Sequence, residues 1–291
     1  MMDGNDTSEK QAFGNKSAIV TGASSGIGFA ISRVLCELGY EVYGFGRNFD
    51  ALCEEGIRQT GAEHPAGNCQ ERLEDGFGDL EKNSRQKTTE LCFDGKGRFH
   101  KVQGDLLDTG WLCNQVREIS RNSQLEVLVN AAGVGYYGLH EQLSVEQIQT
   151  LVRTNLEVPL ILSNRLLRVL KQNRGYMINI SSITAKQSSP HGCAYGAVKA
   201  GLTSFGESLF DEARKYGVKV TTIHPDMTDT NLYRDADITC SEEEGSFLLA
   251  SEVADAVRYV LSQREGMVVP DITLRPQLHR IARKKKTRED T

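Results

Sequence analysis

Short apolar runs rich in β-branched residues alternate along this chain with longer segments whose apolar residues recur at helical spacing. The alternation predicts strands at 17–22, 40–46, 99–105, 125–133, 175–182, 218–225 and 266–272, and helices at 26–38, 109–121, 144–171, 195–216 and 251–263. Such alternation is typical of an α/β fold, with helices on both faces of a parallel sheet. Because crossovers between parallel strands are right-handed, we expect one doubly wound sheet with a ligand crevice at the carboxyl ends of the strands.

The predicted elements belong to a single domain at 15–272, because a chain of 291 residues suits one large domain better than two small ones. We expect residues 1–14 to be a flexible N-terminus and residues 273–291 to be a basic C-terminal tail. The segment at 50–97 is polar, rich in glycine and weakly periodic, and it is far longer than a crossover needs. We predict an inserted surface excursion there, either disordered or folded as a small cap.

Composition excludes several kinds of function. A formal net charge of -5 at pH 7 gives no overall field to gather nucleic acid, and the basic tail is interpreted as a solvated end, with a nucleic-acid or anionic-lipid contact as the alternative. The 7 cysteines lack a C-x-x-C pair, and His64, Cys69 and Cys92 fit no ligand template, so we expect reduced thiols and no metal site. No run approaches the ~20 apolar residues that span a bilayer, and residues 1–14 lack the core of a signal peptide. We therefore expect a cytoplasmic protein with no nucleic-acid or membrane partner.

A glycine-rich loop, "TGASSGIG" at 21–28, joins the first strand to the first helix. Gly22 permits the tight turn, Gly26 lets the main chain approach an anion, and Gly28 allows the helix to pack closely on the strand. The helix start offers free N–H groups and a positive dipole end to a pyrophosphate, although G-x-x-x-G-x-G departs from the G-x-G-x-x-G fingerprint. The residues predicted to bind phosphate are Gly22, Ser24, Ser25, Gly26, Ile27 and Gly28.

A tyrosine and a lysine stand four positions apart in "YGAVK" at 195–199. On a helix Tyr195 and Lys199 share a face. A nearby ammonium favours a phenolate and lowers the pKa of a phenol from ~10 toward the working range, which would make Tyr195 a general acid/base. A Tyr–Lys pair on the surface of an amphipathic helix is the alternative.

Several short motifs occur together in one order: "TGASSGIG", "NAAG" at 130–133, Asn155 in "TNLEVP", "NISS" at 179–182, and "YGAVK". This series resembles the motifs of the short-chain dehydrogenase/reductase family over residues 15–272. The resemblance implies a single Rossmann-like domain that uses NAD(H) or NADP(H) to interconvert alcohols and carbonyls, usually as a homodimer or homotetramer.

The resemblance also implies a role for each catalytic position. Ser182 would bind the substrate oxygen and stabilise its developing charge, with Ser181 as the neighbouring candidate. Lys199 would tune Tyr195 and hold the nicotinamide ribose. Asn155 would hold a water that links Lys199 to solvent, and a structural asparagine bonded to its own helix is the alternative.

Further cofactor contacts are implied at the ends of other strands. The family pattern gives Asp105 and Leu106 the adenine, and a capping aspartate is the alternative. It gives Asn130, Ala131 and Gly133 the packing against the cofactor, places Met227 beside the nicotinamide, and assigns Thr230 to a phosphate or carboxamide. One position departs from the family, because "HPDMTDT" at 224–230 has Asp226 where glycine is common. A carboxylate near a pyrophosphate is repulsive unless it is turned away.

The end of the second strand predicts NADP(H) as the preferred cofactor, with NAD(H) also possible. NAD-binding relatives usually place an acidic residue about twenty residues beyond the glycines, whereas this chain has Gly46 and then Arg47. A guanidinium offers a fork of donors to a 2′-phosphate. A solvated surface arginine is the alternative, and Gly46→Asp with Arg47→Ile is expected to shift the preference toward NAD(H).

The leading hypothesis is therefore a carbonyl reductase or alcohol dehydrogenase for a secondary alcohol and its ketone, and a steroid (as in a hydroxysteroid dehydrogenase), fatty or xenobiotic carbonyl is the suggested substrate. A nucleotide-sugar epimerase or dehydratase is a second possibility among enzymes. A non-catalytic protein that senses a dinucleotide is the alternative from another class, because fold alone does not exclude it.

Overall fold

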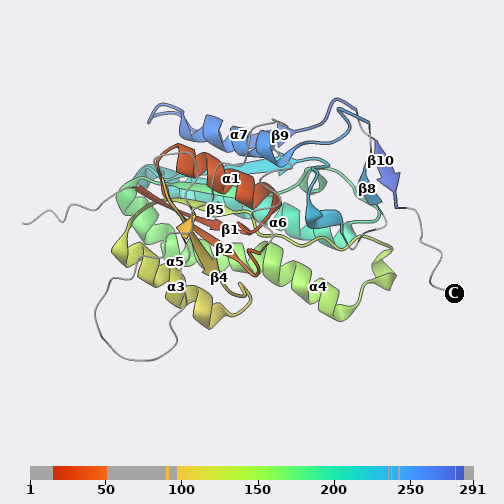
Figure 1. Cartoon of the computed structure of the whole chain (residues 1–291), viewed down its shortest axis with the longest axis horizontal. Coiled ribbons are helices and arrows are strands. Elements are labelled where there is room, and N and C mark those ends of the chain that lie inside the picture. The colour runs from red at the N-terminus through yellow and green to blue at the C-terminus, as the bar shows by residue number, and fades with distance from the viewer. Residues whose placement is uncertain are drawn as a thin grey trace, which may run out of the picture.

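A sheet of eight strands forms the centre of the structure (Figure 1). Its strands are β1 (Lys16–Thr21), β2 (Glu41–Gly46), β3 (Glu90–Leu91), β4 (Phe99–Gln103), β5 (Gln124–Asn130), β6 (Tyr176–Ile180), β7 (Lys219–Pro225) and β9 (Asp271–Leu274), in the spatial order β3-β4-β2-β1-β5-β6-β7-β9. β3 pairs antiparallel with β4, and every other pairing in this sheet is parallel. The predicted α/β class and doubly wound sheet are confirmed.

This computed structural model describes residues 16–50, 90–91, 97–234, 236, 238–241, 243–278 and 280–284. The predicted flexible terminus at 1–14 and nearly all of the predicted excursion at 50–97 lie outside the described residues. Those two predictions are therefore untested.

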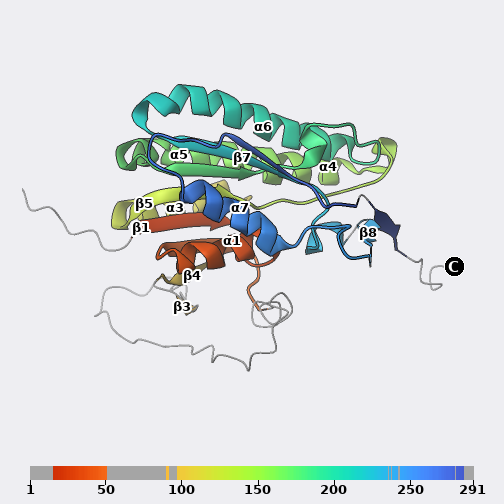
Figure 2. The ribbon, with the colours of Figure 1, turned by 90° about the horizontal axis from the view of Figure 1, so that it is seen from above.

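Helices cover both faces of the sheet (Figures 1 and 2). One face carries α1 (Gly26–Glu37) and α7 (Ala250–Leu261). The other carries α3 (Thr109–Asn122), α5 (Val158–Asn173) and α6 (Cys193–Ala213), and α4 (Val145–Val152) leads into α5. Single turns of 3₁₀ helix lie at His140–Gln142, Ile183–Ala185, Arg214–Tyr216 and Asn231–Tyr233.

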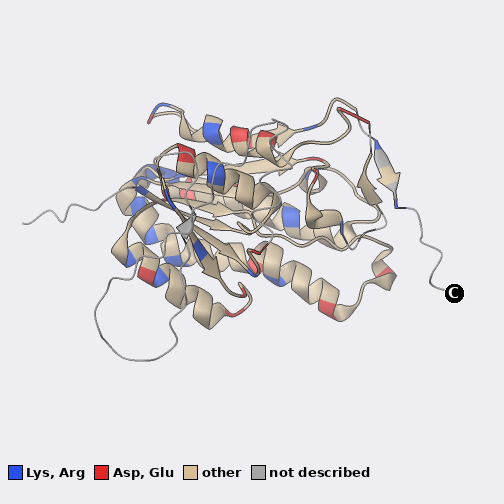
Figure 3. Ribbon diagram, in the orientation of Figure 1, with Lys and Arg blue, Asp and Glu red and all other residues tan. Residues whose placement is uncertain are grey.

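The apolar core consists of two layers, one on each side of the sheet. Successive side chains of a strand point to opposite faces, so Ala18 and Val20 of β1 join the layer under α1 and α7. Ile19 between them joins the layer under α3, α5 and α6. Burial on both faces explains why the central strands β1, β5 and β6 are largely apolar runs. On the outer faces of the helices, Figure 3 shows charged residues of both signs interspersed on α1, α3 and α7.

The helix predicted at 144–171 is interrupted by a π-helical turn at Arg153–Glu157, between α4 and α5. Proline has no N–H, so Pro159 in the first turn of α5 cannot donate to the carbonyl of Asn155 four residues earlier. The side-chain amide of Asn155 donates to the carbonyl of Leu151, four residues earlier, at 3.0 Å. This local widening of the helix sets the position of Asn155, as π turns often do at functional sites.

The C-terminal segment folds further than the sequence analysis predicted. The predicted domain boundary at residue 272 lies inside β9. The strand predicted at 266–272 begins only at Asp271, because Pro270 precedes it and cannot donate to a neighbouring strand. Beyond it, β10 (Ile281–Arg283) pairs antiparallel with β8 (Ile238–Cys240) in a separate small sheet. The Lys284 ammonium also donates to the carbonyls of Tyr233 and Arg234, at 2.8 and 2.7 Å. Part of the predicted tail therefore holds the segment between β7 and α7, and residues 285–291 lie outside the described structure.

A chain that ends at Leu278 is expected to keep its fold, because β10 and β8 form a sheet apart from the eight-stranded one. The melting temperature should fall by only a few degrees, at about 2–4 °C for each 1 kcal/mol lost. Limited proteolysis within 231–241 should become faster, because β8 loses its partner strand. Loss of cooperative unfolding in the truncated chain, with the full-length chain as control, would contradict this.

Candidate active site

An open cleft of about 480 Å³ lies at the carboxyl ends of the central strands. It brings together most of the residues predicted for the site: Gly22, Ser24, Ser25, Gly26, Ile27, Gly28, Arg47, Asp105, Leu106, Ala131, Gly133, Ser182, Tyr195, Lys199 and Thr230. Asn130, Asn155 and Met227 do not line the cleft and are buried behind its wall. Other residues also line it, among them Tyr136, Thr154, Leu232, Tyr233 and Arg234.

The glycine loop is shaped by close contacts of the main chain. Gly22 has a φ of 69°, and a Cβ there would lie 2.8 Å from the Cα of Ala132. A Cβ on Gly28 would lie 2.3 Å from the carbonyl oxygen of Gly22, so only glycine lets α1 start so near β1. The side chain of Ser25, which precedes α1, makes no capping hydrogen bond to the helix. The first turn of α1 holds no acidic residue. This helix start therefore fits an anionic group in the cleft.

Residues at the ends of β1, β5 and β6 are joined by buried hydrogen bonds. Thr21 Oγ1 accepts from the main-chain N–H groups of Ala131 and Ala132, each at 3.1 Å. Asn130 Nδ2 donates to Asn179 Oδ1 at 2.8 Å. Asn130 thus ties β5 to β6, and Thr21 ties the "NAAG" segment to the glycine loop.

Two predicted contacts of the adenosine end lie on turns. Asp105 Oδ1 accepts from the Leu107 N–H at 2.9 Å in an Asx turn, whereas the aspartate that caps α3 is Asp108, three residues later. Arg47 is exposed at the rim of the cleft, and its carbonyl accepts from Gln103 Nε2 at 3.1 Å. A Cβ on Gly46 would lie 2.8 Å from Ser24 Cβ, so the substitution Gly46→Asp would displace the glycine loop.

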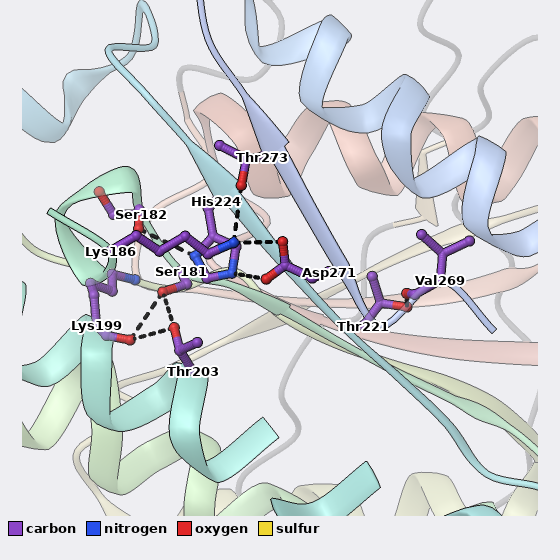
Figure 4. A network of polar contacts seen from close by, with 10 residues as sticks. All are labelled: Ser181, Ser182, Lys186, Lys199, Thr203, Thr221, His224, Val269, Asp271 and Thr273. Carbon is purple, nitrogen blue, oxygen red and sulfur yellow. Dashed lines mark hydrogen bonds and ion pairs between the residues drawn. The ribbon is translucent and has the colours of Figure 1, made fainter. Parts of the chain in front are cut away.

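The two serines after β6 differ in their contacts. Ser181 Oγ donates to the Lys199 carbonyl at 3.0 Å and lies 2.9 Å from Thr203 Oγ1, so it faces α6 (Figure 4). Ser182 Oγ accepts from the N–H and the hydroxyl of Thr184, at 3.2 and 3.0 Å. Both contacts use lone pairs of the Ser182 oxygen, so the hydroxyl proton of Ser182 stays available to a partner in the cleft. The Ser182 hydroxyl is also within hydrogen-bond reach of the Tyr195 hydroxyl.

Tyr195 and Lys199 are both buried on α6, with 3% and 4% of their surfaces exposed. Burial raises the pKa of Tyr195 to about 12, and hydrogen bonds with Ser182 and Tyr137 oppose that rise. Burial lowers the pKa of Lys199 to about 8. The Lys199 ammonium donates to the Ile180 carbonyl at 2.9 Å and lies 5.7 Å from the centre of the Tyr195 ring. The expectation that Lys199 lowers the pKa of Tyr195 is therefore wrong in direction: burial raises that pKa, and the hydroxyls that oppose the rise belong to Ser182 and Tyr137.

Asn155 is fully buried next to this pair. Its Nδ2 donates to the carbonyls of Val134 and Leu151, each at 3.0 Å, while Oδ1 has no hydrogen-bond partner. A Cβ on Gly133 would lie 2.9 Å from Asn155 Oδ1 and 3.6 Å from Lys199 Nζ. Gly133 thus keeps space open between the unpaired Asn155 Oδ1 and the Lys199 ammonium. The bond from Asn155 to the Leu151 carbonyl is the structural role that the sequence analysis named as the alternative.

Two more tyrosines join Tyr195 at the substrate end of the cleft. The Tyr137 ring lies between those of Tyr195 and Tyr233, with ring centres 5.4 and 5.5 Å apart. No local signal shows that Tyr137 reaches Tyr195, because 58 positions separate them (195 − 137).

Asp226 lines the cleft with the glycine loop, and both of its carboxylate oxygens have partners. Its Oδ1 accepts from the Met227 N–H at 2.8 Å, and its Oδ2 accepts from Arg275 Nε at 3.2 Å. The Asp226 side chain is 6% exposed and that of Arg275 is 51% exposed. Arg275 therefore offsets the negative charge of Asp226, which the sequence analysis expected to repel a pyrophosphate.

No cluster of three or more His, Cys, Asp or Glu residues in the described part of the chain could hold a metal ion. No described helix is both long enough and apolar enough to span a bilayer.

Comparisons with known proteins agree with this arrangement. The short chain dehydrogenase family matches residues 77–240. An uncharacterized oxidoreductase of Staphylococcus epidermidis is 30% identical over 262 residues, which cover 90% of this chain and 97% of the relative. One of Staphylococcus saprophyticus is 30% identical over 263 residues, with the same coverage. The chain therefore belongs to the short-chain dehydrogenase/reductase family, whose members are NAD(P)-dependent oxidoreductases.

Solved structures share the fold. An alcohol dehydrogenase from the archaeon Thermococcus sibiricus superimposes with a TM-score of 0.67 at 22% identity, covering 91% of this chain and 97% of that one. A serine dehydrogenase gives a TM-score of 0.67 at 19% identity, covering 89% and 94%.

Removing the partner of Asp226 is expected to destabilise the protein. Arg275→Ala leaves a buried carboxylate without this donor and should lower the free energy of unfolding by about 1–3 kcal/mol. Adding Asp226→Asn should recover part of the loss, because the charge is gone. Denaturant unfolding measures both, with Glu212→Ala, which breaks an exposed pair with Lys171, as a control within about 0.5 kcal/mol of wild type. If Arg275→Ala and Glu212→Ala lower the free energy of unfolding equally, the Asp226–Arg275 pair contributes no more to stability than an exposed ion pair.

Proposed function

We propose that this protein is an NADP(H)-dependent oxidoreductase that interconverts a secondary alcohol and a ketone, with Tyr195 as the general acid/base. The observation that carries the proposal is the convergence of Ser182, Tyr195 and Lys199 at one end of a cleft. The glycine loop and Arg47 line the same cleft and fit the phosphates of a dinucleotide.

The proposed chemistry divides between cofactor and protein. When bound, the nicotinamide supplies or accepts the hydride at the reacting carbon. Tyr195 supplies the proton to the carbonyl oxygen, and its raised pKa of about 12 keeps it protonated at neutral pH, as carbonyl reduction requires. Ser182 donates its remaining proton to the same oxygen and stabilises the charge that develops there.

Lys199 and Asn155 support the proton donor. The ammonium, held by the Ile180 carbonyl, lies over the Tyr195 ring and would also hold the ribose hydroxyls. The unpaired Asn155 Oδ1 across the space at Gly133 fits an acceptor for a water bound to Lys199. Such a water would return a proton toward Tyr195 after each turnover.

The substrate end of the cleft supports a partly apolar, medium-sized ketone, with a steroid, fatty or xenobiotic carbonyl among the candidates. Tyr136, Leu232 and Tyr233 line it with apolar area, and Arg234 and Thr154 add polar groups. Self-association as a homodimer or homotetramer is supported by exposed apolar side chains on α4 and α5, namely Val145, Val152 and Leu160. Free cysteines at Cys36, Cys113, Cys193 and Cys240 favour the cytoplasm.

Tyr195→Phe is expected to lower the rate of carbonyl reduction by ~10²–10⁴-fold, because only the proton donor is removed. NADPH affinity should stay within about threefold, because the ring still packs in place. Absorbance of NADPH with a panel of ketones measures the rate, and fluorescence titration measures the affinity. Tyr176→Phe, at the opposite end of the sheet, is the matched control. Unchanged turnover in Tyr195→Phe would remove this residue from the mechanism, and a wild type that binds NADPH but reduces no ketone would favour the dinucleotide sensor.

Arg47→Ala is expected to weaken the preference for NADP(H). Loss of charge-assisted bonds to the 2′-phosphate costs about 1.5–3 kcal/mol, or about 10–150-fold in kcat/KM with NADPH, while kcat/KM with NADH should change little. The archaeal alcohol dehydrogenase is complexed with 5-hydroxy-NADP and the serine dehydrogenase with NADP+, whereas a 4-hydroxyisoleucine dehydrogenase of the same fold is complexed with NADH. Arg98→Ala, which does not line the cleft, is the control. An equal fall with both cofactors, or a wild type that prefers NADH, would refute the assignment of Arg47.

A further inference from the structure

A buried histidine lies behind the serine of the site (Figure 4). His224 of β7 is 0% exposed. Its Nε2 lies 2.7 Å from Asp271 Oδ2 on β9, and its Nδ1 lies 3.3 Å from the carbonyl oxygen of Ser182. The proposed chemistry uses the hydroxyl of Ser182 and leaves this imidazole without a role.

Both ring nitrogens of His224 face acceptors. A neutral imidazole carries one N–H, and the shorter contact assigns it to Nε2, which donates to the Asp271 carboxylate. Nδ1 then faces the Ser182 carbonyl without a proton. The imidazolium carries a second N–H at Nδ1, and this would donate to that carbonyl. The ring therefore has two states that differ in a hydrogen bond to the main chain of Ser182.

The charges around the ring decide which state is populated. Asp271 Oδ1 accepts from Lys186 Nζ at 2.5 Å, and Lys186 also donates to Thr273 Oγ1 at 3.1 Å. Burial is the largest influence and lowers the pKa of His224, Lys186 lowers it further, and Asp271 opposes both. At pH 7 the ring is therefore neutral, and it gains its second proton on the acid side.

We propose that His224 is a positioning residue for Ser182, whose neutral ring sets the main chain of the serine for reaction and whose protonation slows the reaction. The inference rests on the proposed function. Protonation converts the 3.3 Å contact to an N–H···O bond, which prefers about 2.9 Å, and so draws the Ser182 carbonyl toward β7. The serine hydroxyl shifts with it relative to Tyr195. Because misplacement of about 1 Å at a reacting centre costs about 10²-fold, a shift of a few tenths of an ångström is expected to cost several-fold in rate.

This inference predicts an ionisation that the rest of the mechanism lacks. Tyr195 stays protonated far above neutral pH, so it produces no loss of carbonyl reduction in acid. We expect kcat of ketone reduction with NADPH to fall several-fold on the acid side, with a midpoint below the ordinary histidine value of ~6.5. Lys186→Met should move that midpoint to higher pH, and Asp271→Asn should move it to lower pH. Both side chains are partly exposed, at 36% and 40%, so these variants spare the core.

Two substitutions of the ring itself separate its contacts. The amide of His224→Gln can reach Asp271 but places no donor at Nδ1, so its rate should stay near the neutral plateau without the acid fall. His224→Asn places a donor toward the Ser182 carbonyl at every pH, so its rate should be several-fold lower and independent of pH, with KM for NADPH unchanged. Thr221→Val is the matched control, because Thr221 lies on β7 with His224 but does not contact Ser182. The substitution removes the 2.7 Å hydrogen bond from Thr221 Oγ1 to the Val269 carbonyl, and it should keep the wild-type pH profile.

A second readout does not depend on turnover. With ¹³C-labelled serine carbonyls and ¹⁵N-labelled histidine, the Ser182 carbonyl and the His224 ring should titrate with one midpoint in NMR spectra, displaced in opposite directions by Lys186→Met and Asp271→Asn. A Ser182 signal that does not follow the ring, or variants that leave the midpoint unmoved, would overturn the role of His224. A wild-type protein that reduces no ketone would overturn the proposed function instead. The NMR titration would still show whether protonation of His224 moves the Ser182 carbonyl.

Discussion

A buried polar row crosses the sheet at one level and holds the ends of its central strands together. Thr21 of β1 is in register with Asn130 of β5, Asn130 with Asn179 of β6, and Asn179 with Thr222 of β7. All are nearly inaccessible to solvent, so their hydrogen bonds are made within the protein, and only Asn130 Oδ1 and Asn179 Nδ2 of this row lack a partner. Thr21 binds the turn after β5, and Asn130 binds Asn179. Because the strands are parallel, everything that follows this row in sequence is delivered to the same edge, where the cleft lies.

Burial acts on the candidate acid and its neighbouring amine in opposite senses. Desolvation disfavours the charged form of any group, so the pKa of Tyr195 rises and that of Lys199 falls. Both residues are thereby driven toward their neutral forms. The hydroxyls of Ser182 and Tyr137 work against this for the phenol. The same balance holds at His224, where burial outweighs the attraction of Asp271.

Three local departures from the sequence prediction have physical causes. The helix expected at 144–171 breaks into α4, a π turn and α5, because a proline inside the pattern removes a main-chain donor. The chain after residue 272 completes β9 and then returns as β10, which pairs with β8. A strand of three residues within a basic segment carries no usable periodicity, so the sequence indicated only a basic tail.

The sequence alone determined the fold class and the order of the motifs, since periodicity and glycine spacing depend on neighbours within a few residues. It identified Tyr195 and Lys199 as one pair because a helix puts positions four apart on one face. Only the tertiary structure showed that the Ser181 hydroxyl is bound to α6, that Tyr137 lies on Tyr195, and that Arg275 offsets the charge of Asp226. It alone brought His224 between Ser182 and Asp271, residues separated by 42 and 47 positions from the histidine. Such contacts depend on strand order and burial, which bring distant residues together without leaving a local pattern in the sequence.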